Sequence, residues 1–169
     1  MYRGSIEVEE STHPLLVRDL RVIPGGGGAG RFRGAPGAEV IYGPRFDPMT
    51  VVIMCDGQAN PPQGVRGGHA GPCAETWHVR ADGSEEKLPG VVECQVEPGE
   101  WIRGVDAGGG GYGSPLEREP ARVLKDVLAR WETIERAHDI YGVVFSGTVE
   151  DESLAVDEAA TSKRRAELQ

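Results

Sequence analysis

The sequence predicts an α+β fold, in which a mainly antiparallel β domain, sandwich or barrel-like, is followed by C-terminal helices. Short apolar runs separated by Gly, Pro and Asp-Gly recur through most of the chain, as in β-sandwiches and barrels. After residue 115 the apolar residues instead recur at helical spacing. We expect a single domain over residues 1–169, with a β part over 1–107 and a helical part over 115–169.

The strands follow from alternation and from the turns between them. Ile6 and Val8 alternate with acidic residues and predict an edge strand over residues 3–10. Tight turns are expected at Asp82-Gly83 and at Pro98-Gly99. Further strands are expected over residues 15–23, 38–43, 50–55, 74–80, 91–97 and 101–106.

Helical spacing begins after the second glycine run. The apolar pattern predicts a helix over residues 120–131, with Pro120 in its first turn. A second helix is expected over 132–139, ending near Tyr141-Gly142. A strand or an anchoring segment over 143–145 and a last helix over 157–167, capped by Asp157, complete the predicted elements.

Charge and cysteine content exclude several function classes. The chain carries 18 basic and 27 acidic residues, so its net charge of -9 repels nucleic acids and anionic membranes. Three cysteines form no disulfide framework. No signal peptide and no apolar run long enough to span a bilayer are present, so we expect a cytoplasmic protein.

Catalytic and metal-binding motifs are weak. The glycine run at 25–30 is followed by neither a helix nor a Walker lysine, so a nucleotide site is not predicted. His69, Cys73 and His78 have spacings that zinc accepts, but there is no Cys-x2-Cys pair, and we expect no metal site. No serine or cysteine has a base at a motif spacing, so no catalytic residue is predicted. Asp56 is interpreted as a turn residue.

Several motifs, in order, resemble those of the hydantoinase B/oxoprolinase family. They are GGAGRFRG at 27–34, PPQG followed by GGHAG at 61–71, GGGGYGSPLEREP at 108–120, YGVV at 141–144, and the terminal DEAAT at 157–161. Ser114 departs from the aspartate that the family usually has there. The resemblance covers nearly the whole chain, whereas the family's large N-terminal region, with its inferred metal-binding residues, has no counterpart in it.

The resemblance implies a small non-catalytic subunit of a multisubunit ATP-dependent enzyme that hydrolyses a lactam or hydantoin. A subunit of an ATP-dependent ketone carboxylase, of the acetone or acetophenone type, and a free-standing binding module remain as alternatives. The implied partners are a hydantoinase A-like and a truncated hydantoinase B-like subunit. ATP and a divalent metal are expected in those partners and no cofactor in this chain, which we expect to be inactive by itself.

The interface candidates lie in the two glycine runs. Arg31 and Arg33 flank Phe32 beside the first run and are the cationic candidates. In the second run, Tyr112 carries a large side chain and is expected at a subunit contact. Its neighbours Gly108, Gly109, Gly110 and Gly111 are expected to form a contact or cleft-lining loop. A Gly110→Val variant is expected to weaken the assembly or activity of the complex but to leave the secondary structure of the isolated chain mostly intact.

Overall fold

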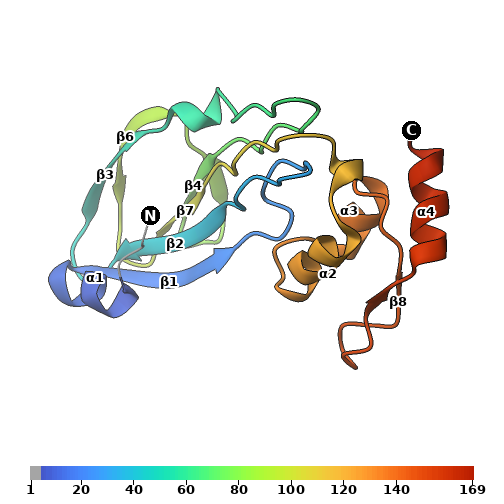
Figure 1. The fold of residues 1–169 in the computed structure, drawn as a ribbon. Coiled ribbons are helices and arrows are strands. Elements are labelled where there is room, and N and C mark those ends of the chain that lie inside the picture. Colours follow the sequence, from blue (N-terminus) through green and yellow to red (C-terminus); the bar gives the residue numbers. More distant parts are fainter. Residues whose placement is uncertain (1–4) are drawn as a thin grey trace. The chain divides into compact units, whose positions relative to one another are not determined.

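The computed structural model describes residues 5–169, which divide into two compact units (Figure 1). The first, the β unit, comprises the described residues up to Arg21, Ala38–Asn60 and Cys73–Asp106. The second, the glycine–helix unit, comprises Val22–Gly37, Pro61–Pro72 and Ala107–Gln169. Thus two glycine-rich segments from the predicted β part belong to the same unit as the helices.

The β unit contains a five-stranded and a two-stranded sheet. The larger sheet has the strand order β1 (Leu15–Val22), β2 (Ala38–Pro44), β7 (Trp101–Val105), β4 (Glu75–Val79) and β5 (Glu85–Lys87). The smaller sheet pairs β3 (Met49–Met54) with β6 (Val91–Val96) in antiparallel register. The β2–β7, β7–β4 and β4–β5 pairs are also antiparallel.

One apolar core joins the two sheets of the β unit. Val51 and Val96 come from the smaller sheet, Ile102 comes from β7, and all three are buried together with Leu88. Two sheets that share a core in this way form a sandwich. The predicted α+β class, with an antiparallel sandwich, is therefore confirmed.

The glycine–helix unit contains three of the four α-helices of the described chain. They are α2 (Pro120–Leu128), α3 (Ile134–Asp139) and α4 (Glu158–Glu167), and the unit also has a 3-10 turn at Pro115–Glu117 and the two-stranded pair β8 (Phe145–Ser146) and β9 (Ala155–Val156). Its core includes Val123 and Val127 of α2 with Tyr141 and Val143. As predicted, Asp157 caps the last helix, accepting the backbone N–H of Ala160 at 2.9 Å.

The predicted edge strand over 3–10 is wrong within the described residues, because α1 (Ile6–Thr12) is a helix there. Two apolar residues are too few for alternation to outweigh helical features. Glu7 and Glu9 lie in the first turn, where acidic side chains interact favourably with the helix dipole. The carboxylate of Glu10 then accepts the backbone N–H of Val17 at 2.8 Å, which links α1 to β1.

The remaining predictions differ from the structure mainly at the ends of elements. The helix predicted over 120–131 ends at Leu128, and Arg130 then adopts a left-handed φ of 57°. Gly83 and Gly99 have φ of 84° and 93°, consistent with the two predicted turns. No apolar pattern predicts β5 (Glu85–Lys87), which consists of three exposed charged residues. No helix in the described residues is long and apolar enough to cross a membrane.

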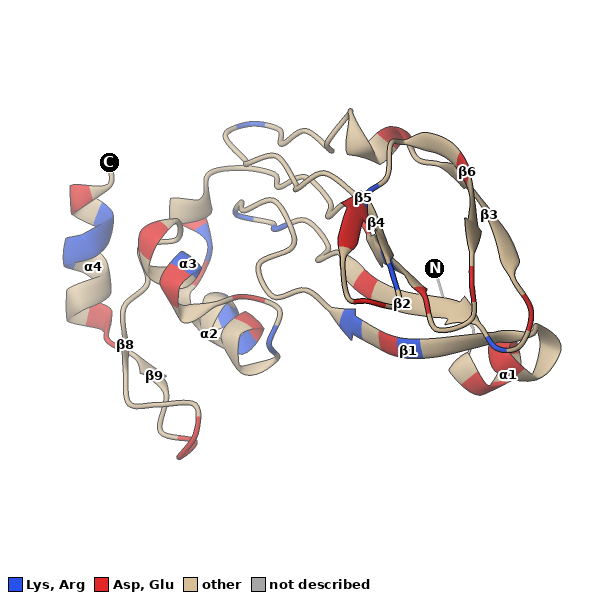
Figure 2. Cartoon of the chain, turned by 180° about the vertical axis from the view of Figure 1, so that it is seen from behind, with Lys and Arg blue, Asp and Glu red and all other residues tan. Residues whose placement is uncertain are grey.

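Acidic and basic residues are interspersed along the chain in both units (Figure 2). Several of them form ion pairs between neighbouring strands, such as Lys87 of β5 with Glu75 of β4 at 2.7 Å and Arg21 of β1 with Glu39 of β2 at 2.6 Å. The net charge of -9 is therefore not concentrated in a single acidic run.

Candidate functional site

Three glycine-rich segments pack side by side in the glycine–helix unit. We call residues 25–37, 61–72 and 108–113 the first, second and third glycine segments, and together the glycine bundle. Each pair of segments is joined by a backbone hydrogen bond. Gly28 N–H donates to the carbonyl of Gly109 at 2.8 Å, His69 N–H to that of Ala29 at 2.7 Å, and Gly111 N–H to that of His69 at 2.9 Å.

The bundle requires glycine because its backbones touch directly. A Cβ atom at Gly110 would overlap with the carbonyl oxygen of Gln63, and one at Gly111 would overlap with that of Ala29. Glycine is the residue that allows such a close approach of two backbones. Gly108 and Gly111 are buried, and Gly109 and Gly110 are partly buried.

These contacts correct one expectation about the third segment. Because a side chain at Gly110 would meet the backbone of the second segment, a Gly110→Val variant is now expected to disrupt the fold of this unit itself. The third segment is a packed structural element with a defined conformation, and not a plain connector. A role for Gly108 to Gly111 at a subunit interface stays a prediction.

Three large side chains project from the glycine bundle to the surface. Phe32 comes from the first segment, Val65 from the second and Tyr112 from the third. The exposed fractions of their surfaces are 52%, 54% and 42%, respectively. Phe32 and Tyr112 exchange backbone hydrogen bonds of 3.0 and 2.8 Å, and their ring centres lie 6.3 Å apart. The structure therefore places the predicted Tyr112 beside Phe32.

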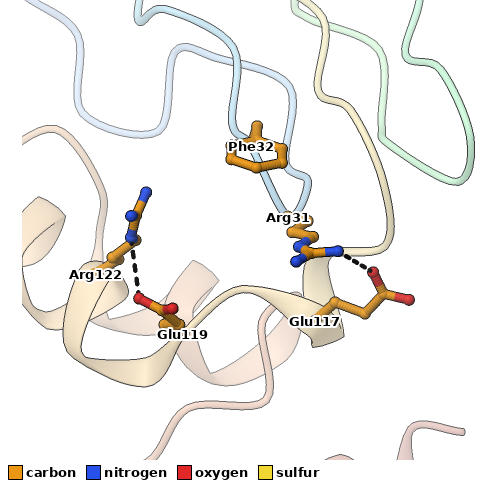
Figure 3. Close-up of a pocket in the computed structure, with 5 residues that line it drawn as sticks. All are labelled: Arg31, Phe32, Glu117, Glu119 and Arg122. Atoms are coloured by element: carbon orange, nitrogen blue, oxygen red, sulfur yellow. Dashed lines mark hydrogen bonds and ion pairs between the residues drawn. The ribbon is translucent and has the colours of Figure 1, made fainter.

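Arg31 lines a surface cavity of about 150 Å³ (Figure 3). The cavity is also lined by Phe32, Glu117, Glu119 and Arg122. Arg31 lies 3.9 Å from the carboxylate of Glu117, and Arg122 lies 3.0 Å from that of Glu119. Two cations and two carboxylates balance, so the cavity has no net charge with which to attract an anion.

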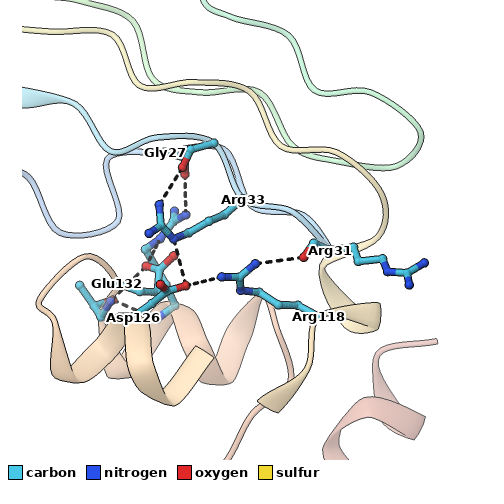
Figure 4. A network of polar contacts seen from close by, with 9 residues as sticks. Gly27, Arg31, Arg33, Arg118, Asp126 and Glu132 are labelled. Atoms are coloured by element: carbon cyan, nitrogen blue, oxygen red, sulfur yellow. Dashed lines mark hydrogen bonds and ion pairs between the residues drawn. The ribbon is translucent and has the colours of Figure 1, made fainter. Parts of the chain in front are cut away.

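Arg33, the other cationic candidate, points into the unit (Figure 4). Its Nε donates to Asp126 Oδ2 at 2.9 Å, and Arg118 donates to the same oxygen at 2.7 Å. Asp126 and Arg118 are 6% and 7% exposed. The guanidinium of Arg33 therefore links the first glycine segment to α2. The sequence patterns did not predict this cluster. The position of Asp126 between Val123 and Val127, on the apolar face of α2, is the signal that could have indicated it.

The zinc candidates have other surroundings. His78 is buried in β4, and its Nε2 lies 2.8 Å from the carboxylate of Glu100. Cys73 is exposed, as is His69, whose backbone belongs to the glycine bundle. Residues 5–169 contain no group of three or more His, Cys, Asp or Glu side chains that could hold a metal ion.

The remaining candidates have structural roles or no defined partner. Asp56 begins a 3-10 turn and accepts a hydrogen bond from the Asn60 side chain at 2.7 Å. Cys55, Cys73 and Cys94 are free thiols, and burial raises the pKa of Cys94 above its ordinary value. A reactive thiol needs a lowered pKa, so Cys94 is not poised as a nucleophile.

Comparison with known proteins assigns the family. Residues 1–115 match the Hydantoinase B/oxoprolinase family. The match covers more than half of the chain, and the chain belongs to this family.

Individual relatives match over nearly the whole chain. It is 35% identical to the caprolactamase subunit beta of Pseudomonas jessenii, over 96% of this chain and 28% of that protein. It is 25% identical to the acetone carboxylase alpha subunit of Xanthobacter autotrophicus, over 98% of this chain and 26% of that protein. The chain thus spans about a quarter of the length of these relatives.

Solved structures agree with this assignment. The chain matches the crystal structure of the ATP-dependent caprolactamase from Pseudomonas jessenii with a TM-score of 0.77 and 30% identity, over 96% of this chain and 28% of that chain. The nucleotide-free structure of acetone carboxylase matches with a TM-score of 0.75 and 24% identity, over 98% of this chain and 26% of that one, and supports the fold alone.

Proposed function

We propose that this chain is a non-catalytic, structural part of a multisubunit ATP-dependent enzyme that hydrolyses a lactam or hydantoin amide. The observation that carries the proposal is its 35% identity to the beta subunit of a caprolactamase, over 96% of its length. The partners would be a hydantoinase A-like subunit and a hydantoinase B-like subunit. ATP and a divalent metal would bind to those partners.

The geometry of the described residues supports a structural role. The cavity beside Arg31 has its charges paired, and Arg33 is used in a buried ion cluster. Neither site has a nucleophile beside a general base, the arrangement that covalent amide hydrolysis requires. The glycine bundle instead holds three segments in one defined conformation, which suits a surface that positions a neighbour.

The test is to reconstitute the complex with and without this chain. We would co-express it with the hydantoinase A-like and B-like subunits of the same organism and measure ATP-dependent hydrolysis of ε-caprolactam and hydantoin. Activity is expected from the complete complex. The chain alone and the other subunits alone are both expected to be inactive. Hydrolysis by the isolated chain, or an equal rate when it is omitted, would overturn the proposal.

The second candidate is a part of a ketone carboxylase. It is favoured by the match to the acetone carboxylase alpha subunit over 98% of this chain, although identity is only 25%. Replacing the amide by acetone and bicarbonate in the same assay separates the two reactions. Ketone-dependent ATP consumption that requires bicarbonate, with no amide hydrolysis, would establish the carboxylase instead.

A further inference from the structure

The exposed end of the glycine bundle gathers apolar and cationic side chains from three separate segments. Phe32, Val65 and Tyr112 form its apolar part, joined through backbone bridges from Tyr112 to each of the other two. The guanidinium of Arg31 lies 5.7 Å from the ring centre of Phe32, and that of Arg66 lies 5.7 Å from the ring centre of Tyr112. We call these five residues the aromatic patch.

The backbone beneath the patch is pre-organised. Val65 N–H donates to Gly111 at 2.9 Å, Gly113 N–H donates to Val65 at 2.9 Å, and Arg31 N–H donates to Gly113 at 3.1 Å. Side chains on a backbone held in this way lose less conformational entropy when a partner binds. The patch is therefore a rigid surface built from loops, which ordinarily would be mobile.

Arg66 has an uncommon backbone conformation. Its φ of 53° lies in the left-handed region, which is uncommon for residues other than glycine. The neighbouring residue is Gly67, which could adopt such a conformation more easily and itself has a φ of 88°. This conformation places the Arg66 guanidinium beside the exposed ring of Tyr112.

We propose that the aromatic patch is the surface on which a partner subunit docks, through a segment with an apolar side chain flanked by carboxylates. The proposal rests on the proposed function as part of a multisubunit enzyme. Aromatic residues and arginine are the types that dominate binding energy at interfaces. Arg66, and Arg31 once it is released from Glu117, would pair with carboxylates of the partner. Glu117 is the described carboxylate closest to Arg31, at 3.9 Å, and a partner could displace so loose a pair.

A second copy of this chain fits the patch less well. In a two-fold symmetric dimer the same surface faces itself, so Arg31 and Arg66 would lie close to the same two arginines of the other copy. Like charges brought together in an interface are repulsive. The charge pattern therefore favours a different subunit.

The test compares charge reversal inside and outside the patch. The other subunits, co-purified without this chain, would be titrated with wild type, Arg66→Glu and Arg130→Glu, and the Kd measured by biolayer interferometry. Arg130 is a matched control, because it is exposed, belongs to the same unit and has a φ of 57°. Arg66→Glu is expected to raise Kd about tenfold or more, and Arg130→Glu less than about twofold.

The apolar part is tested with a second matched pair. Phe46 is 70% exposed, and the Arg45 guanidinium lies 5.6 Å from its ring centre. This pair matches Arg31 and Phe32, for which the same distance is 5.7 Å. Phe32→Ser is expected to raise Kd about tenfold or more, and Phe46→Ser less than about twofold. Circular dichroism and thermal melts establish that each variant is folded. For the wild type, Kd should also rise with salt, and less steeply so for Arg66→Glu.

The outcomes separate this inference from the proposed function. If the wild type does not bind the other subunits, the proposed function fails and this inference fails with it. If the wild type binds but the folded Arg66→Glu and Phe32→Ser variants bind equally well, only the docking surface is wrong. Size-exclusion chromatography of the chain alone completes the test, since self-association that Arg66→Glu abolishes would assign the patch to a second copy instead.

Discussion

The two units of this chain are stabilised by different kinds of contact. In the β unit, apolar side chains such as Val96 and Ile102, 0% and 1% exposed, fill the space between two sheets. In the glycine–helix unit, three backbones pack directly on one another, and a buried ion cluster lies beside a small apolar core. The first arrangement is weakened gradually when atoms are removed, whereas the second has no room for one additional carbon atom at positions such as Gly110 and Gly111.

The largest effect is expected from adding a methyl group to the glycine bundle. Gly110→Ala would place a Cβ against the carbonyl of Gln63, a backbone atom that cannot move without displacing the second segment. We expect a loss of more than about 5 kcal/mol, enough to unfold the unit. Hydrogen exchange with mass spectrometry would show lost protection in the glycine–helix unit.

A matched glycine in the β unit provides the control. A Cβ at Gly104 would lie 3.5 Å from Val40 Cγ1, an ordinary van der Waals distance. Gly104→Ala should change the free energy of unfolding by less than about 1 kcal/mol. Equal stability of the two variants would show that the bundle is more adaptable than its packing indicates.

The next largest effect concerns the ion cluster. Asp126→Ala would leave the buried guanidinium of Arg118 and the partly buried guanidinium of Arg33 without their shared carboxylate. Removing one partner of a buried pair costs about 3–5 kcal/mol, which urea denaturation would measure. Glu119→Ala, which breaks an exposed pair with Arg122, should cost less than about 0.5 kcal/mol. A similar cost for both would contradict the structural role of the cluster.

In the β unit, a cavity should have a graded cost. Ile102→Ala removes a buried side chain at the centre of the sandwich and should cost about 3 kcal/mol. Val52→Ala, at a residue that is 61% exposed, should cost less than about 0.5 kcal/mol. Chemical denaturation of both variants measures the difference. If Ile102→Ala were as disruptive as Gly110→Ala, the proposed distinction between the units would be lost.

The smallest effect is a pH dependence in the core of the glycine–helix unit. Tyr141 is 1% exposed, and its hydroxyl has no hydrogen-bond partner among the described residues. Burial raises the pKa of Tyr141 from 10.0 to about 12. Above pH 10 the unfolded chain therefore loses this proton while the folded chain retains it. The stability that the protonated Tyr141 hydroxyl contributes is complete below pH 10 and is lost as the pH rises toward 12.

Tyr141→Phe isolates this contribution. At pH 8 the variant should unfold within about 1 kcal/mol of the wild type, because no hydrogen bond is lost. Between pH 8 and 11.5 the wild type should lose about 2 kcal/mol more than the variant. Urea denaturation at both pH values measures the difference, and parallel pH profiles would contradict the assigned pKa shift.

Sequence patterns located most of the β unit and the helices, because these elements follow local rules. Apolar runs marked β1 and β2, and an aspartate at a cap position marked the start of α4. The predictions for the short elements failed because these elements contain too few residues for a local pattern. Two apolar residues could not distinguish α1 from a strand, and β5 has no apolar residue that would mark it.

The candidate site was only partly predictable. Arg31 and Tyr112 were chosen from their places beside the glycine runs, and both lie at the exposed end of the bundle. Arg33, two positions from Arg31, instead points inward and binds Asp126, which lies 93 residues away in the sequence. No local pattern connects residues at such a separation.

The sequence by itself determined the family, the fold class and the approximate order of elements, because ordered motifs and local periodicity carry that information. Only the tertiary structure decided that residues 25–37, 61–72 and 108–113 pack as one bundle. Glycine has no side chain, so a glycine-rich segment carries no sequence pattern that indicates which backbone it contacts. That choice is made by backbone hydrogen bonds between distant segments, and it places Phe32, Val65 and Tyr112 on one surface.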